Sequence, residues 1–163
     1  MTQPDIVVRD ARAEDEPELL TIDQKAWTPA SGFPSLGTPT AFFDDDNPPD
    51  CHLVAEADGA VAGYIRLKPV TRLAENRHVL GVFGLAVAEA ARGRGVGGAL
   101  LDAAERRARA KGHRKLSLRV LGTNTGAVRL YERHGYLREG LLVREFVIED
   151  RYVDDLLMGK WLD

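Results

Sequence analysis

Four glycines and two arginines stand together in residues 92–98, between an apolar run and a helical pattern. The segment is Arg92-Gly93-Arg94-Gly95-Val96-Gly97-Gly98, with the apolar run at 79–87 before it and the helical pattern at 99–111 after it. Glycine permits positive φ and carries no Cβ that would keep a ligand away. A glycine-rich turn that opens a helix therefore directs several backbone N–H groups at one place, where the helix dipole also favours negative charge. The segment predicts a pocket for a phosphate or pyrophosphate; the alternative is a tight turn that is rich in glycine only for close packing.

The length of 163 residues suits one domain with a substantial core, and we expect a single domain over residues 1–163. The longest nearly unbroken apolar stretch, 79–88, is too short to span a bilayer. The N-terminus lacks the basic and then apolar pattern of a signal peptide. Cys51 is the only cysteine, which excludes an internal disulfide and a cysteine-based metal cluster. We therefore expect a cytoplasmic protein with no membrane partner and no metal.

The net charge of −3 hides a strong asymmetry along the chain. Residues 1–58 carry thirteen acidic against three basic side chains, whereas residues 92–119 carry nine basic against two acidic ones. Such a division suggests different ligand surfaces, although most of these charges can equally be solvated helix faces. The basic segment has no aromatic residues between its charges, so we expect no nucleic-acid partner.

Apolar periodicity and turn residues predict seven strands and three helices in the order β-α-β-β-β-α-β-α-β-β. The strands are expected at 6–9, 51–57, 60–69, 78–87, 115–121, 137–148 and 152–161, and the helices at 13–26, 99–111 and 125–134. The strand at 78–87 shows no alternation, which is typical of a strand buried on both faces, and the unit 78–121 should be a parallel, right-handed crossover. Residues 27–50 contain five prolines and predict a long loop with one short helix near 38–43.

Gly93, Gly95 and Gly98 also fit the G-x-G-x-x-G fingerprint of dinucleotide-binding folds. That fold needs an acidic residue about 20 positions on, at the end of the next strand, yet residues 120–124 hold no acid. The 65 residues after Gly98 are too few for a full doubly wound sheet, and no Gly-Lys-Ser/Thr ending makes a P-loop. A nicotinamide enzyme is therefore the weakest alternative.

Three ordered motifs resemble one known family. The pattern Arg92-x-x-Gly95-x-Gly97, between a strand and a helix, is similar to an acetyl-CoA pyrophosphate loop. Residues 124–136 are similar to the pattern N-x-x-A-x-x-L-Y-x-x-x-G-F/Y, and residues 152–158 are similar to a closing strand. Together these motifs resemble the GCN5-related N-acetyltransferase (GNAT) family over roughly residues 78–160, about half of the chain.

The resemblance implies a single-domain α/β fold with a mixed, mostly antiparallel sheet, a splayed parallel pair of strands and flanking helices. It also implies that an acetyl group moves from acetyl-CoA, the cosubstrate, to a primary amine by direct attack in a ternary complex. In that family the pantetheine arm lies between the splayed strands and pairs with exposed main chain, as an added strand would. The resemblance implies neither a metal nor a cysteine nucleophile.

The resemblance also assigns roles to individual residues. Main chain along the pantetheine arm would come from Leu85, Ala86 and Val87, with an N–H near Leu85 or Val87 facing the thioester oxygen. The pyrophosphate would be held by Arg92, Gly93, Arg94, Gly95, Val96, Gly97 and Gly98. Asn124 would contact the arm or the thiol, Ala127 would allow close approach, and Tyr131 would protonate the departing thiolate. From the residues alone, Asn124 could equally be a helix cap and Tyr131 a packing aromatic.

The general base is the main departure from the family pattern, because many members place a glutamate on the strand that is 78–87 here, and this strand has no acid. Glu75, His78, Glu145 and Asp154 are open candidates, as are a base acting through water and entry of the neutral amine. The missing glutamate also leaves a second function open, a non-catalytic acyl-CoA-binding sensor or partner domain.

The acceptor would lie opposite the cosubstrate, against the acidic and aromatic stretch 27–50. A cationic amine could be drawn to Asp44, Asp45 and Asp46 and stack on Trp27 or Phe43, unless the three aspartates only solvate a loop. Small amines and peptide amines both stay possible acceptors, and a monomer and a homodimer are equally compatible with the sequence.

Overall fold

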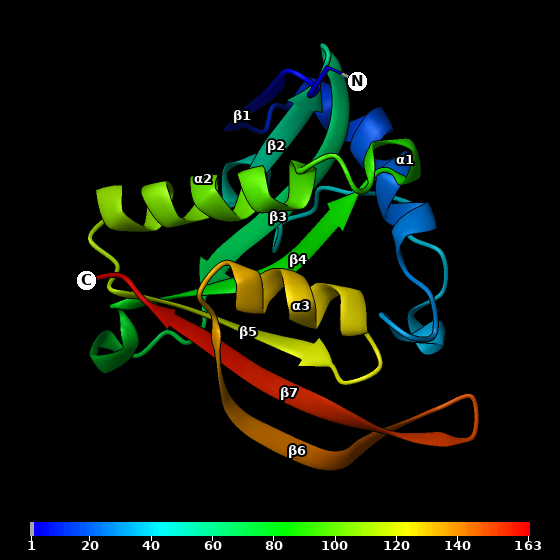
Figure 1. Ribbon diagram of the computed structural model, residues 1–163, viewed down its shortest axis with the longest axis vertical. Coiled ribbons are helices and arrows are strands. Elements are labelled where there is room, and N and C mark those ends of the chain that lie inside the picture. The colour runs from blue at the N-terminus through cyan, green and yellow to red at the C-terminus, as the bar shows by residue number, and fades with distance from the viewer. Residues whose placement is uncertain (1) are drawn as a thin grey trace.

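The computed structural model describes residues 2–163 and contains one seven-stranded mixed sheet with three α-helices (Figure 1). Every neighbouring pair in the order β1-β2-β3-β4-β5-β7-β6 is antiparallel except β4 with β5, which confirms the predicted sheet and its one parallel crossover. The strands are β1 (Ile6–Asp10), β2 (His52–Ala57), β3 (Ala60–Pro69), β4 (Val79–Val87), β5 (Lys115–Leu121), β6 (Leu137–Ile148) and β7 (Arg151–Trp161). A doubly wound dinucleotide fold would instead have a mostly parallel sheet.

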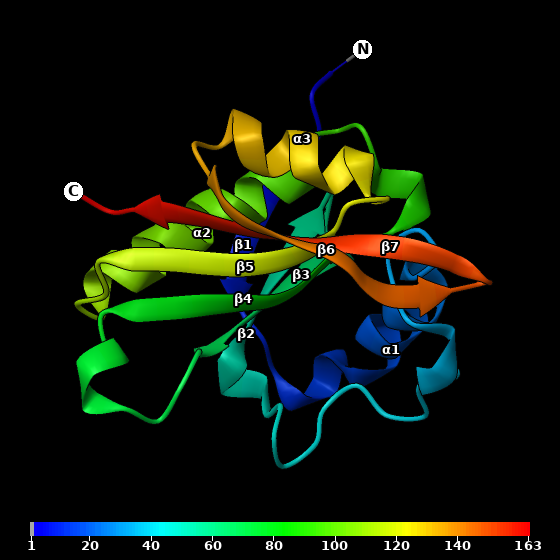
Figure 2. The same ribbon diagram turned by 90° about the horizontal axis from the view of Figure 1, so that it is seen from below.

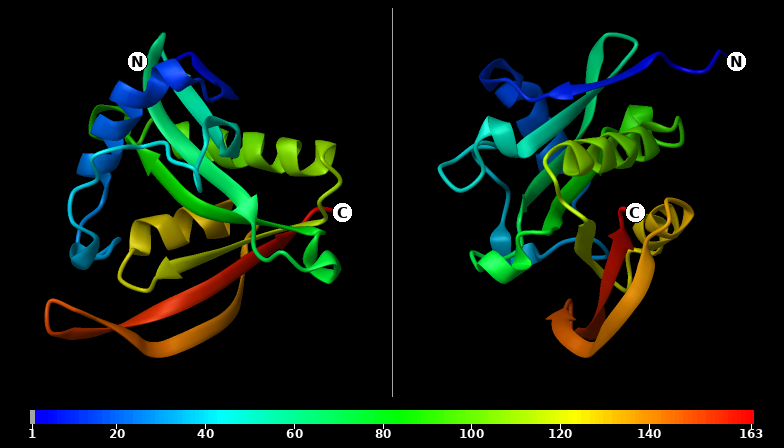
Figure 3. Two further views of the ribbon diagram at one scale, coloured as in Figure 1. Left: turned by 180° about the vertical axis from the view of Figure 1, so that it is seen from behind. Right: turned by 90° about the vertical axis from the view of Figure 1, so that its left-hand side faces the viewer.

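The helices cover both faces of the sheet. α2 (Val96–Ala110) and α3 (Thr125–Arg133) lie on one face, and α1 (Glu16–Ala26) lies on the other, as Figure 2 shows. The larger core lies under α2 and α3, and a smaller core joins α1 to β3 and β4 through Leu19, Ile22, Tyr64 and Ala86. The β6–β7 hairpin reaches beyond the rest of the sheet (Figure 3).

The apolar positions of α2 recur at helical spacing and explain why this segment packs as a helix. Val96, Leu100, Leu101 and Ala104 are all buried against the sheet, and a fully buried leucine contributes about 1.5–3 kcal/mol. The helix stops at Gly112, whose φ of 83° is left-handed, which confirms the predicted C-terminal glycine.

The parallel pair of strands separates partway along its length. β4 and β5 pair only from Val79 to Val82, opposite Lys115 to Leu118. The β3–β4 register shifts by one residue at the same point, leaving Phe83 without a partner on β3. A bulge bends its strand and increases the local twist, so the carboxyl-terminal part of β4 diverges from β5 (Figure 1). Burial on both faces holds for the first part of β4 only, since Phe83 is 50% exposed, and here the prediction of a fully buried strand is wrong.

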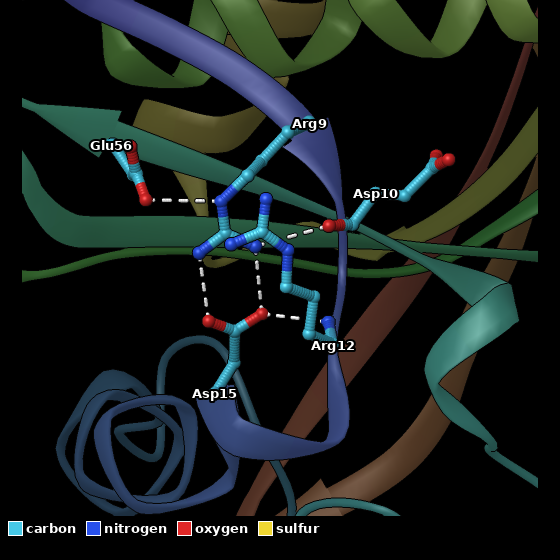
Figure 4. Close-up of polar contacts among 5 residues, drawn as sticks. All are labelled: Arg9, Asp10, Arg12, Asp15 and Glu56. Carbon is cyan, nitrogen blue, oxygen red and sulfur yellow. Dashed lines mark hydrogen bonds and ion pairs between the residues drawn. The ribbon is translucent and has the colours of Figure 1, made fainter.

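An ion-pair cluster fixes how the chain leaves β1 and enters α1 (Figure 4). The Arg9 guanidinium donates two hydrogen bonds of 2.8 Å to the buried Asp15 carboxylate and one of 3.0 Å to Glu56 on β2. The Arg12 backbone N–H donates to the same carboxylate, at 2.7 Å. Because hydrogen bonds from Arg9 stabilise the charged form, the pKa of Asp15 lies below its ordinary value.

The segment between α1 and β2 differs from its prediction. No helix forms near 38–43; short 3₁₀ turns lie instead at Pro34–Leu36 and Pro49–Cys51. The reason is that the backbone N–H groups of Phe42 and Phe43 donate to the Glu16 carboxylate, at 2.6 and 2.9 Å, and so are not available to a helix. Within residues 2–163, no helix has the length and apolar character needed to cross a membrane.

Candidate active site

The glycine-rich segment enters α2 through two left-handed residues. Gly93 has φ of 73°, and Gly95, the N-cap of α2, has φ of 91°. A side chain with a Cβ strains such a conformation by about 1–2 kcal/mol, so glycine is needed at both positions. A Cβ at Gly93 would meet no atom within 4 Å, and one at Gly95 only Ile6, at 3.8 Å. The space beside both residues is therefore open to a ligand.

The backbone N–H groups of residues 93–98 donate to no acceptor within residues 2–163, and no side chain caps α2. The first helical hydrogen bond in this region runs from the N–H of Ala99 to the carbonyl of Gly95. Consecutive unpaired donors at a helix N-terminus bind anionic oxygen atoms, and the helix dipole adds to the attraction. The segment therefore fits a phosphate or pyrophosphate group.

The other two glycines serve close packing, as the alternative interpretation predicted. A Cβ on Gly97 would lie 3.0 Å from Leu130, and one on Gly98 would lie 2.9 Å from His134. Both contacts lie between α2 and α3, so these glycines allow the two helices to approach each other. The packing explanation therefore applies to Gly97 and Gly98, whereas Gly93 and Gly95 leave open space in which a ligand could lie.

The two arginines of the segment have different partners. Arg92 donates to the carbonyl of Val87 at 3.2 Å, whereas Arg94 forms an ion pair with Asp58 in the β2–β3 turn at 2.9 Å. Arg92 also lines a groove of about 510 Å³ between α1 and residues 87–92, together with Lys25. The residues lining this groove are Thr21, Ile22, Lys25, Val87, Ala88, Glu89, Ala90 and Arg92.

The end of β4 presents main chain that is paired on one side only. Leu85, Ala86 and Val87 pair with β3, while their other edge, on the side of β5, is unpaired because the pairing of β4 with β5 ends at Val82. Leu85 and Val87 pack against the larger core, and Ala86 belongs to the smaller core under α1. A half-paired strand next to an anion site can receive an extended ligand along its free edge.

Asn124, the N-cap residue of α3, and Tyr131, within α3, lie on the other side of the separated strands. The Asn124 side chain accepts a hydrogen bond of 3.3 Å from the N–H of Ala127, so it caps α3 as one of the two interpretations predicted. Tyr131 is 7% exposed and packs on Tyr136 with ring centroids 5.6 Å apart. Burial raises the pKa of Tyr131 to about 12, so its hydroxyl stays protonated at neutral pH.

Two of the four sequence-based candidates for a base lie at the end of β4 that is far from this site. Glu75 and His78 precede β4 at its amino-terminal end, and His78 stacks on Trp161. A strand rises about 3.3 Å per residue, so His78 is roughly 20 Å from Leu85. Asp154 accepts a hydrogen bond of 2.7 Å from the N–H of Arg144 within the β6–β7 hairpin, and Glu145 is exposed on β6.

The acidic run of the long loop organises its own turn. The Asp44 carboxylate accepts hydrogen bonds from the backbone N–H groups of Asp46 and Asn47 and from the Asn47 side chain. Phe43 packs edge-on against Phe42, with ring centroids 5.1 Å apart. The Asp44 carboxylate is therefore used within the turn itself, whereas a role of Asp45 and Asp46 in binding an acceptor stays a prediction.

A carboxylate that sequence reasoning missed lies on α1. Asp23 accepts a hydrogen bond of 2.5 Å from the Tyr64 hydroxyl and one of 2.8 Å from the Trp27 indole N–H. The Trp27 contact has helical i, i+4 spacing and could have been found in the sequence. The Tyr64 contact joins residues 41 apart and could not.

The long loop between α1 and β2 connects α1 to the far side of the separated strands. The Thr123 hydroxyl, just before α3, donates a hydrogen bond of 2.7 Å to the carbonyl of Ala30. Phe33 packs against Phe146 of β6 with ring centroids 4.8 Å apart. The loop thus joins the α1 side of the molecule to the β5–α3 connection and to the last hairpin. Among residues 2–163 no group of three or more metal-ligating side chains gathers.

Comparison with known proteins agrees with this geometry. The acetyltransferase (GNAT) family matches residues 16–136. A Bacillus subtilis (strain 168) protein, assigned as an alanine N-acetyltransferase of ribosomal protein bS18, is 31% identical over 93% of this chain and 92% of its own. The ribosomal-protein-alanine N-acetyltransferase of Brucella melitensis is 26% identical with a TM-score of 0.75, covering 96% of this chain and 99% of its own. Salmonella typhimurium yncA, solved with its cofactor acetyl-CoA, shares the fold at 22% identity and a TM-score of 0.77, covering 98% of this chain and 95% of its own. With its unpaired amides at residues 93–98 and its half-paired β4, the chain belongs to the GNAT family and transfers an acetyl group from acetyl-CoA to an amine.

Proposed function

We propose that the enzyme acetylates a primary amine by direct attack on acetyl-CoA in a ternary complex, at the site between β4 and α3. The observation that carries the proposal is the run of unpaired N–H groups at residues 93–98, beside a strand whose edge is free. The pyrophosphate of the cosubstrate would bind those N–H groups. Its pantetheine arm would extend along Leu85, Ala86 and Val87.

This chain's own groups would polarise the thioester and stabilise the leaving group. A backbone N–H near Leu85 or Val87 would donate to the thioester oxygen, on which negative charge develops during attack. Tyr131, protonated because its pKa is about 12, would donate its proton toward the departing thiolate. Asn124 would hold the arm with its side-chain amide, whose oxygen already caps α3.

Direct attack is supported by the position of the one cysteine. Cys51 lies just before β2, two strands away from β4, in a hollow with Lys68. An acetyl-cysteine intermediate would need a thiol beside the thioester. The amine itself is therefore the proposed nucleophile.

The acceptor is a primary amine of a peptide or of a small molecule. The names of the Bacillus and Brucella relatives favour a peptide α-amine. All residues in the proposal come from one chain, so both a monomer and a homodimer could carry out the reaction. The proposal includes neither a nucleic acid nor a membrane as a partner. The location in the cytoplasm stays a prediction.

The test combines binding of acetyl-CoA with release of free thiol over a panel of amines, including peptides with N-terminal alanine. Gly95→Val should weaken acetyl-CoA binding at least 100-fold, since the new side chain would occupy the open space beside the N–H groups. Gly112→Val is the matched control, because Gly112 ends the same helix with a similar left-handed φ of 83° and equally open surroundings.

Equal affinity of the Gly95→Val and Gly112→Val variants would remove the loop from the site. Binding of acetyl-CoA without thiol release on any amine would instead favour the non-catalytic sensor.

A further inference from the structure

We infer that Asp23 is the carboxylate that binds the acceptor's ammonium group and takes its proton, an assignment that rests on the proposed function. Asp23 lies on α1, the helix on the sheet face opposite α2 and α3 (Figure 2). That face holds the smaller core, to which Ala86 at the end of β4 belongs. An amine approaching from this side would reach the thioester opposite the pyrophosphate loop.

Two donors orient the carboxylate through a single oxygen atom. The Tyr64 hydroxyl and the Trp27 indole both donate to Oδ1 of Asp23, at 2.5 and 2.8 Å. Neither Oδ1 nor Oδ2 receives a further hydrogen bond from residues 2–163, and Asp23 is only partly buried. Oδ2 is thus held in place and available to a ligand, which is the geometry expected of a group that accepts a proton.

The same contacts place Asp23 beside the part of β4 that the thioester would reach. A Cβ built on Gly84 would lie 3.9 Å from the Tyr64 hydroxyl, which is itself 2.5 Å from Asp23. Gly84 is the first residue after the unpaired Phe83 and precedes Leu85 of the proposed oxyanion contact. Tyr64 thus contacts both Asp23 and the main chain at Gly84.

Tyr64 is a positioning residue in this arrangement. It is 1% exposed and packs edge-on against Phe42, with ring centroids 4.7 Å apart. Burial, with the Asp23 charge, holds the Tyr64 pKa well above its ordinary value, so the hydroxyl remains a donor. The other charge acting on Tyr64 is Arg66 of β3, whose guanidinium donates to His52.

The proposed reaction balances in protons and bonds. Asp23 takes one proton from the ammonium and later releases it to solvent. The neutral amine attacks the carbonyl carbon, and the C–S bond breaks as the C–N bond forms. The thiolate receives a proton from Tyr131, which regains the second proton lost by the nitrogen. The products are the acetylated amine, the free thiol and one proton in solution.

The test uses Asp23→Asn, whose side-chain carbonyl can still accept from Tyr64 and Trp27. At pH 7 the variant should lose about 100-fold in kcat/KM for the amine, a typical contribution of acid–base catalysis, while its affinity for acetyl-CoA and its Tm stay unchanged. The deficit should shrink about tenfold per pH unit up to the pKa of the amine, since the neutral amine then no longer needs a proton acceptor. Glu18→Gln, on an exposed site of the same helix, is the control and should retain activity.

A deficit below threefold, or one that is the same at every pH, would overturn the assignment, because loss of structure alone gives no pH-dependent recovery. Failure of the wild-type enzyme to release thiol with any amine would instead refute the proposed function itself. Tyr64→Phe separates orientation from chemistry: it should lose about tenfold in kcat/KM and keep the wild-type pH profile.

Discussion

Lowering the pH should destabilise the protein through one buried histidine. His52 is 0% exposed, and its ring lies 5.0 Å from that of Phe42. Arg66 donates to Nε2 at 2.8 Å, so Nδ1 carries the proton and donates to the carbonyl of Pro48 at 2.9 Å. Burial, reinforced by the positive charge of Arg66, lowers the pKa of His52 to about 4. Protonation would leave two cations side by side in the core.

The size of the effect follows from the two pKa values. The pKa is about 4 in the folded chain and 6.5 for an unperturbed histidine. Above pH 6.5 both states are neutral and the stability is complete. As the pH falls from 6.5 toward 4, the unfolded state binds a proton that the folded state does not, and stability is lost at about 1.4 kcal/mol per pH unit. The loss should reach about 2 kcal/mol at pH 5.

Urea unfolding at pH 7.5, 6.0 and 5.0 measures this loss. His52→Gln keeps an acceptor for Arg66 but cannot titrate. Between pH 7.5 and 5.0 the free energy of unfolding of this variant should therefore decrease by about 2 kcal/mol less than that of the wild type. His113→Gln, which removes a histidine outside this cluster, controls for the loss of an imidazole as such. Parallel curves for the wild type and His52→Gln would refute the reasoning.

Two further variants test the strands and the proton donor. Tyr131→Phe should reduce turnover about 100-fold. The reduction should be the same at pH 7 and at pH 9, because the Tyr131 pKa of about 12 lies outside that range. Steady-state kinetics check this, and an unchanged rate would assign Tyr131 to packing alone. Gly63→Ala should lower the free energy of unfolding by about 1–3 kcal/mol, since the new Cβ would lie 2.7 Å from the backbone oxygen of Ala86 on β4. Urea unfolding measures this, and a variant as stable as the wild type would show that β3 and β4 move apart at little cost.

Local patterns account for the parts of the fold that could be predicted. Turn residues such as Asp58-Gly59 and Gly112 depend on backbone conformation, and both lie where the pattern placed them, at the β2–β3 turn and after α2. The prediction of a short helix between α1 and β2 was wrong for the opposite reason. Its backbone N–H groups at Phe42 and Phe43 donate to the Glu16 carboxylate, and Glu16 precedes these two residues by 26 and 27 positions. Long-range partners of this kind leave no periodic signal.

The conformation of the glycine-rich loop could be predicted from the sequence alone. Positive φ at Gly93 and Gly95, followed by the first turn of a helix, is a property of consecutive residues, and so is the run of N–H groups that it leaves unpaired. The surroundings of the loop depend instead on contacts between distant segments. The bulge at Phe83 separates β4 from β5, and the packing of α1 on β3 brings Asp23 to Tyr64. Both depend on how distant segments align across the sheet, because side-chain contacts between strands and helices are set by register and packing and not by local conformation.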